Sequence, residues 1–190
     1  MRRVAVRLCL LFLIAGCSEP PQKEIDRAQG AVDTARAAGA EQYAPAEFAE
    51  ATTALQQAHD AVTQRDYRLA LTRALDASQR AQESARLAAD GQARARSDAE
   101  VAVHGMETAL QQLETKLKVA TTARTPEPEL KSARQALING EGTLQKARSM
   151  LAGGKYLEAR AVVKEAVDEI NGQMRAIDEA AGARTSKRRR

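Results

Sequence analysis

Apolar and small residues recur at alternating spacings of three and four along most of the chain. This heptad pattern is typical of helices that pack side by side in bundles and coiled coils. Five segments carry such a seam: Ile25, Ala28, Val32, Ala35; Phe48, Ala51, Leu55, Ala58, Val62; Ala99, Val103, Met106, Leu110, Leu113, Leu117, Ala120; Leu130, Ala133, Leu137, Gly140, Leu144, Ala147, Leu151; and Tyr156, Ala159, Val163, Ala166, Ile170, Gln173, Ile177, Ala180. The pattern predicts an all-α fold.

Glycine and proline interrupt the seams at three places, which are residues 38–45, residues 125–128 and Gly153-Gly154. Because these residues end or begin helices, we predict the following helices: about 22–38, 45–64, 67–122, 127–152 and 155–181. The expected architecture is a set of elongated antiparallel helical hairpins, or a coiled-coil-like bundle, of about five helices that share one long central helix. Gly91 or Gly105 could bend or break that central helix.

An internal repeat relates two parts of the chain. The segment around Asp66-Tyr67 matches the segment around Lys155-Tyr156 at a constant offset of 89 residues. Upstream, Phe48 matches Leu130 at an offset of 82 residues. The two offsets, 89 and 82, differ by seven residues, which is one heptad, so the seam residues of both segments stay on the same face of their helices. We therefore expect two helical hairpin regions of common design, at residues 23–95 and 96–183.

The first hairpin region has a seam of small side chains. Between Tyr67 and Ala95 almost every seam position of the long helix is alanine. Alanine allows close approach of helices but removes little apolar area from water, at roughly 25 cal/mol per Å². We expect this region to be the less stable one.

The net charge of +4 conceals an uneven distribution. Three arginines lie in the first seven residues, and five basic residues lie in the last seven: Arg184, Lys187, Arg188, Arg189 and Arg190. Without the first group the net charge is +1, and without both groups it is −4. The chain is thus an acidic body with a basic tail at residues 184–190, and nucleic acid is not an expected partner.

The first sixteen residues have the layout of a secretory signal, with arginines, then an apolar run from Leu8 to Ile14, then small residues. This run is far shorter than the ~20 residues that a membrane-spanning helix needs. The segment Leu13-Ile14-Ala15-Gly16-Cys17 resembles the lipobox of bacterial lipoproteins at every position. The alternative is a plain secretory signal whose cleavage leaves a cysteine.

The lipobox resemblance implies specific covalent chemistry at Cys17. A diacylglyceryl group would be attached to its sulfur, cleavage would fall between Gly16 and Cys17, and an N-acyl chain would follow. Two or three acyl chains anchor a protein durably, whereas one does not. An aspartate directly after the lipidated cysteine would favour retention of the lipoprotein at the inner membrane. Here that residue is Ser18, so we expect the protein on the periplasmic face of the outer membrane rather than at the inner membrane or the cell surface.

Residues 17–22 then form a short tether that contains two prolines. At ~3.3 Å per residue, this tether keeps the following helices within ~20 Å of the membrane.

A second resemblance rests on the segment Ala40-Glu41-Gln42-Tyr43-Ala44-Pro45-Ala46-Glu47-Phe48, followed by Leu55, Ala58, Asp66-Tyr67 and Ala70. These residues resemble a family of alanine-rich envelope lipoproteins catalogued as a domain of unknown function, whose members sometimes precede an OmpA-like domain. The likeness covers about residues 24–95. It implies a helical fold and an envelope location but no activity. Arg65 departs from it, since a turn glycine is usual there, and no OmpA-like pattern follows.

Candidates for catalysis or metal binding are few. His59 and His104 each lie beside a seam residue, and neither has a second histidine or cysteine at ligand spacing. Cys9 would leave with the signal, and lipid would occupy Cys17. We expect no enzymatic activity and no metal or cofactor beyond the acyl groups.

The basic tail has two explanations that the sequence leaves open. Basic residues complement the dipole at the carboxyl end of a helix. They would also attract an anionic surface, such as lipid headgroups, lipopolysaccharide or the cell wall.

The sequence therefore predicts a membrane-tethered, non-catalytic helical module that acts as a scaffold, interaction surface or spacer. Its expected partners are the membrane, an unidentified envelope protein or a second copy of itself. The alternative is a periplasmic carrier that opens its alanine seam around a lipid or another hydrophobic ligand.

Overall fold

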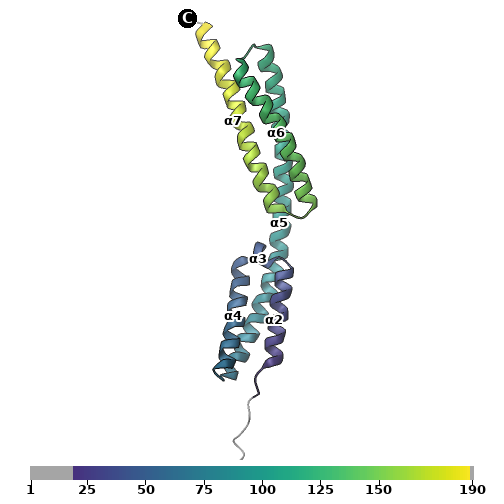
Figure 1. Cartoon of the computed structure of the whole chain (residues 1–190), viewed down its shortest axis with the longest axis vertical. Helices are drawn as coiled ribbons and strands as arrows, with labels where there is room; N and C mark the ends of the chain where they lie inside the picture. The colour runs from purple at the N-terminus through teal and green to yellow at the C-terminus, as the bar shows by residue number, and fades with distance from the viewer. Residues whose placement is uncertain (1–18, 189–190) are drawn as a thin grey trace, which may run out of the picture. The chain divides into compact units, whose positions relative to one another are not determined.

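The structure is a computed structural model that describes residues 19–188, with side chains described through residue 183. The predicted all-α fold is confirmed, because residues 19–188 contain helices and no strand. Six helices follow one another in this range: α2 (Gln22–Ala37), α3 (Ala40–Tyr43), α4 (Pro45–Thr63), α5 (Tyr67–Thr122), α6 (Glu127–Ala152) and α7 (Tyr156–Arg188). Figure 1 shows their order along the chain.

The long central helix is also confirmed. Helix α5 runs for 56 residues without interruption, so neither Gly91 nor Gly105 breaks it. Two predicted boundaries were wrong. A one-turn helix, α3, occupies part of the expected break, because Gly39 takes a left-handed conformation with φ 82° and a new turn starts directly after it. Helix α7 continues to Arg188 instead of ending near residue 181, since no proline stops it there.

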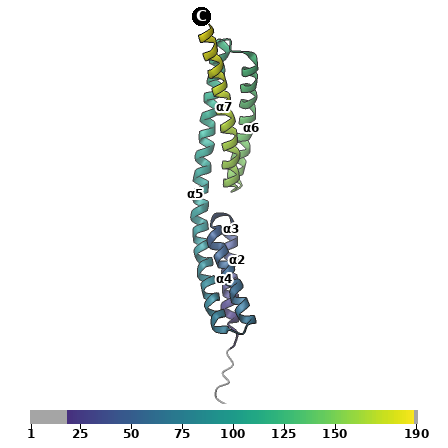
Figure 2. The ribbon, with the colours of Figure 1, turned by 90° about the vertical axis from the view of Figure 1, so that its left-hand side faces the viewer.

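The chain divides into two compact units, Met1–Gly91 and Gln92–Arg190. In the described part, the first unit contains α2, α3, α4 and the first section of α5, and the second contains the rest of α5 with α6 and α7. Within each unit the helices lie side by side in both views (Figures 1 and 2). Each unit is therefore a helix followed by a helical hairpin, and α5 serves as the last helix of one unit and the first of the other.

On the α5 side, the core of the first unit is built from small side chains. Helices α2 and α4 contribute Ile25, Val32, Phe48 and Leu55, whereas the buried positions of α5 carry only small side chains. These positions are Ala70, Ala74, Ala77, Ser78, Ala81, Ser84 and Ala88. The heptad pattern predicts the alanines as seam positions, but it does not predict burial of Ser78 and Ser84. The Ser84 hydroxyl donates to the Ala81 carbonyl at 2.9 Å, which satisfies it inside the seam.

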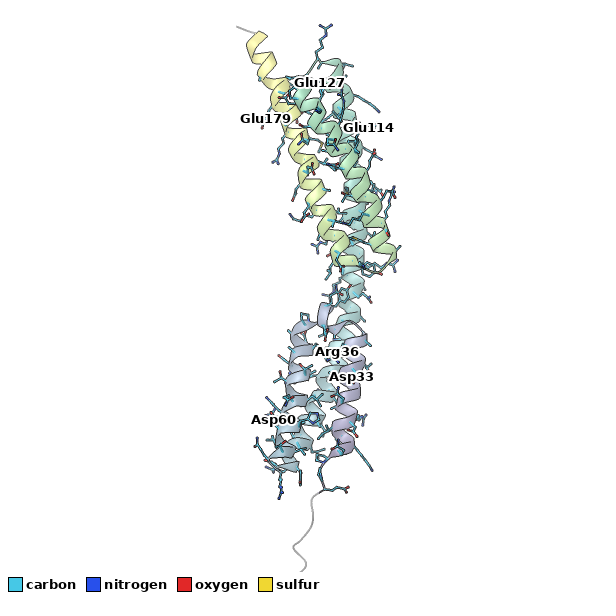
Figure 3. The ribbon with its side chains drawn as sticks, viewed as in Figure 1. Asp33, Arg36, Asp60, Glu114, Glu127 and Glu179 are labelled. Atoms are coloured by element: carbon cyan, nitrogen blue, oxygen red, sulfur yellow. The ribbon has the colours of Figure 1, made fainter. Side chains whose placement is uncertain are left out.

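Polar contacts join the three short elements of the first unit. The Arg36 guanidinium donates to Asp33 of α2 and to Glu41 of α3, each at 2.9 Å. Its central carbon lies 5.4 Å from the centre of the Phe48 ring, at the start of α4. Figure 3 labels Asp33 and Arg36 on α2. One exposed cation thus contacts all three helices, which suits the guanidinium because it can stack and donate at once.

The second unit has a larger apolar core. Met106, Leu113, Val163 and Ile170 are fully buried, and further leucines from α5 and α6 pack around them. Gly140 allows α6 to approach this core closely, because a Cβ at that position would lie only 2.7 Å from Cδ2 of Leu110. These side chains bury far more apolar area than the alanines of the first unit.

The α4–α5 and α6–α7 turns, which the repeat relates, have the same construction, and the α5–α6 turn shares it, with Arg124 at φ 57° and the Thr125 N–H bonded to the Ala120 carbonyl at 3.0 Å. Arg65 and Gly154, 89 residues apart, both adopt a left-handed conformation, with φ of 61° and 74°. After each, the next backbone N–H bonds back by five residues: Asp66 to Ala61 at 2.9 Å, and Lys155 to Met150 at 2.9 Å. Both helices therefore end in a Schellman motif. Only the first turn adds a side-chain cap, where the Asp66 carboxylate accepts the Leu69 N–H at 3.0 Å.

Candidate functional site

The predicted anchor, Gly16 and Cys17, lies outside the described residues. The described chain begins with Glu19-Pro20-Pro21, and α2 starts at Gln22, five residues after Cys17. The Pro21 carbonyl accepts the Ile25 N–H at 3.1 Å, so Pro21 occupies the cap position of α2. The first helix thus begins directly after the two prolines. Only a few residues lie between the expected lipid site and this helix.

The end of the first unit where α2 begins also holds the turn between α4 and α5. Both ribbon views show this (Figures 1 and 2), and Asp60, near the end of α4, is labelled at the same end in Figure 3. A surface groove fixes the register, since Lys23 and Arg27 of α2 border it together with Leu75 and Ser78 of α5. The first turns of α2 therefore lie beside Leu75 and Ser78 of α5, and the first turns of α5 precede this level.

Three leucines are exposed on these first turns of α5. Leu69, Leu71 and Leu75 have 39%, 37% and 54% of their surface accessible. Leu71 and Leu75 are one helical turn apart on the same side of α5, and we call these two the leucine patch, whereas Leu69 lies on another side of the helix. The exposed leucines were not predicted from the sequence because they fall outside the seam. Their only signal is a large apolar residue at a position where the heptad pattern requires none.

The five residues of the basic tail are only partly described. Helix α7 includes the backbone of Arg184, Lys187 and Arg188, whereas Arg189 and Arg190 lie outside the described residues. The predicted tail is thus an extension of α7 over its first five positions rather than a segment that follows the helix.

The two histidines are surface residues that the structure does not bring together. His59 is exposed on α4, and the His104 side chain is 83% exposed on α5. His104 Nδ1 lies 3.4 Å from a carboxylate oxygen of Glu107, whose other oxygen accepts from Arg148 of α6 at 2.7 Å. The hydrogen bond from Arg148, followed by the one from His104, lowers the pKa of Glu107. This cluster joins α5 to α6.

A charged groove lies between α4 and α5 of the first unit. Alanines line it at Ala49 and Ala54, and its rim carries an ion-pair network. Arg80 donates to Asp76 at 2.9 Å and also pairs with Glu50 of α4. The hydrogen bond to Asp76, with the charge of the same carboxylate, raises the pKa of Arg80. These charges satisfy one another and hold the two helices in register.

The described residues hold neither a metal-binding cluster nor a membrane-spanning helix. Within residues 19–188, no three His, Cys, Asp or Glu side chains are grouped so that they could hold a metal ion. Among the described helices, none combines the length and the apolar character needed to span a bilayer.

Comparison with known families gave one match. Residues 23–103 match a family described as a domain of unknown function (DUF4398). The matched range covers α2, α3 and α4 and continues along α5 into the start of the second unit. The resemblance to a domain-of-unknown-function family over about residues 24–95 is confirmed. Neither a curated protein nor a solved structure matched the chain.

Proposed function

We propose that this chain is an envelope lipoprotein, anchored through Cys17, whose helical units act as a non-catalytic scaffold, interaction surface or spacer. The observation that carries the proposal is the lipobox-like segment ending at Cys17, followed within five residues by the first helix. Ser18 favours the periplasmic face of the outer membrane as its location. The acyl groups on Cys17 are the only bound groups that the proposal requires.

The surface chemistry of the units supports a scaffold role. Ion pairs join different helices in each unit, such as Arg80 with Glu50 in the first and Arg148 with Glu107 in the second. Arg160 of α7 adds a contact to Asp98 of α5 at 3.1 Å. Exposed pairs contribute little stability one by one, but they favour one register of the helices. A fixed helical surface is what recognition of an envelope protein, or of a second copy, needs.

The anchor is tested by replacing Cys17 and, as a matched control, the other cysteine of the chain. We expect Cys17→Ser to abolish lipidation and to move the protein from the membrane fraction to the soluble periplasmic fraction. Cys9→Ser should change neither, because Cys9 is removed with the signal. Mass spectrometry of the mature N-terminal peptide measures the modification directly. An unmodified Cys17, or membrane retention of Cys17→Ser, would refute the proposal.

For the basic tail we propose attraction to an anionic surface, which we test by truncation after Ala183. The five basic residues Arg184, Lys187, Arg188, Arg189 and Arg190 would each contribute roughly 1 kcal/mol near anionic lipid at low ionic strength. The truncated protein should therefore bind anionic vesicles or isolated cell wall more weakly than the intact protein, and added salt should remove the difference. Equal binding at low salt would refute the attraction.

A hydrophobic-ligand carrier is the second candidate, and the small side chains of the α5 seam favour it. Seven buried positions there carry only alanine or serine, so opening this seam would cost less apolar contact than opening the second unit. Saturable uptake of a fluorescent fatty acid by the delipidated protein would support the carrier. Absence of uptake would leave the scaffold.

A further inference from the structure

We propose that the leucine patch rests in the headgroup region of the bilayer that holds the anchor, and so gives the first unit a second, reversible membrane contact. This inference rests on the proposed lipid anchor at Cys17. Its partner is the lipid surface itself, not another protein.

Exposed apolar side chains gather in the first turns of α5. Seven large hydrophobic residues are exposed in the described part of the chain, and three of them fall within residues 69–75. Leu71 and Leu75 are one helical turn apart and lie on the same side of α5. The groove beside Leu75 places this side next to the first turn of α2. The exposed leucines are therefore concentrated near the N-terminal end of α2.

The chain between the expected lipid site and α2 is short. Four residues, Ser18–Pro21, lie between Cys17 and Gln22, so five Cα–Cα steps separate the lipidated position from the first helical residue. Fully extended, they span at most about 17 Å, and the two prolines restrict them further. Because α2 starts at the level of Leu75 in α5, a chain held at Cys17 keeps the leucine patch within reach of the headgroups.

Charged side chains surround the leucine patch. Within the described residues, Arg65 and Arg68 form no ion pair, and the Asp66 carboxylate is already bonded to the Leu69 N–H. Arginine can keep its charged head among headgroups while its stem lies on apolar surface. Glu24 borders the same groove as Lys23 and Arg27, so the local charge is mixed. Apolar burial should therefore suffice for the contact without anionic lipid or low salt, and anionic lipid should strengthen it.

The test uses tryptophan as a depth reporter, since the chain has none. Leu75→Trp is made in the full lipoprotein, which is reconstituted into phosphatidylcholine vesicles containing brominated lipid. Leu75 is more than half exposed, so the larger ring fits without disturbing the core. The matched control is Ala46→Trp, an exposed position in the first turn of α4, at the end of that helix farthest from the α4–α5 turn.

We expect bromine to quench Leu75→Trp about twofold more than Ala46→Trp, because interfacial apolar groups penetrate ~5–10 Å, within reach of the bromine. The difference should persist at high salt. Equal quenching of the two variants, with Cys17 shown by mass spectrometry to be lipidated, would overturn this inference and leave the proposed function intact. Emission that is shifted to the blue without quenching would mean that protein covers the patch, which also overturns it. Absence of lipid on Cys17 would overturn both.

Discussion

Gly91 of α5 packs against the backbone of Tyr43 in α3. A Cβ atom at Gly91 would lie 2.8 Å from the Tyr43 carbonyl oxygen and 3.1 Å from the Tyr43 Cβ. Both atoms belong to the first unit, and neither is the end of a flexible side chain. The glycine in the middle of α5 is therefore a packing requirement rather than a hinge.

Gly91→Ala should destabilise the first unit. The added methyl group gains up to about 1 kcal/mol of helix propensity, but the backbone of α3 must move, and overpacking costs typically 1–3 kcal/mol. We expect a net loss of about 1 kcal/mol in the free energy of unfolding, measured by urea denaturation followed by circular dichroism.

The control for that substitution lies in the same helix. A Cβ at Gly105 would meet nothing within 4 Å, so Gly105→Ala should stabilise the protein by about 0.5–1 kcal/mol through helix propensity alone. If both substitutions stabilise equally, the close approach of Tyr43 to Gly91 is not present in solution.

The two hairpin turns predict opposite effects at equivalent positions. Arg65 pays the steric cost of a left-handed conformation, whereas Gly154 does not. Arg65→Gly should raise the free energy of unfolding by about 0.5–1 kcal/mol, and Gly154→Ala should lower it by about 1 kcal/mol. Thermal denaturation of the two variants beside the parent protein provides the measurement. A loss of stability in Arg65→Gly would contradict the assigned turn.

The ion-pair cluster at Glu107 predicts a pH dependence. Hydrogen bonds from Arg148 and His104 hold the pKa of Glu107 below its ordinary value of 4.5, so the folded state favours the ionised carboxylate. The resulting stability is present above the ordinary pKa and is lost as the pH falls through the lowered one. Glu107→Gln should thus be less stable than the parent at pH 7, and the difference should shrink as the pH falls below 4.5. A difference in melting temperature that is the same at pH 7 and pH 3 would contradict this role.

The two units should differ in local stability. In the first, the buried positions of α5 carry only alanine and serine, with the partly buried Leu87 packed against them, while in the second α5 contributes Met106, Leu110, Leu113 and Leu117. Amide hydrogens of residues 70–88 should exchange faster than those of residues 103–120, because less apolar surface opposes local opening. Hydrogen exchange followed by mass spectrometry compares the two segments within one helix. Equal protection would show that the alanine seam packs as tightly as the leucine seam.

The sequence alone placed most of the helices. Heptad spacing located the seams, and glycine and proline located the breaks, so the bounds of α5 and α6 were predicted to the residue. The pattern could not show α3, because four residues are too short to display a helical period. It also could not locate the end of α7, since the glycine in this stretch, Gly182, is tolerated inside the helix and no proline follows it.

The proposed chemistry at Cys17 likewise comes from local sequence, because an export signal and its lipidation site are read as a linear segment. Which surface residues come together is a different kind of information. The approach of Gly91 to Tyr43, the pairing of Arg148 with Glu107, and the position of the leucine patch beside the start of α2 join residues that are far apart in the chain. Heptad periodicity assigns a residue to a face of its own helix, and only packing decides what that face meets.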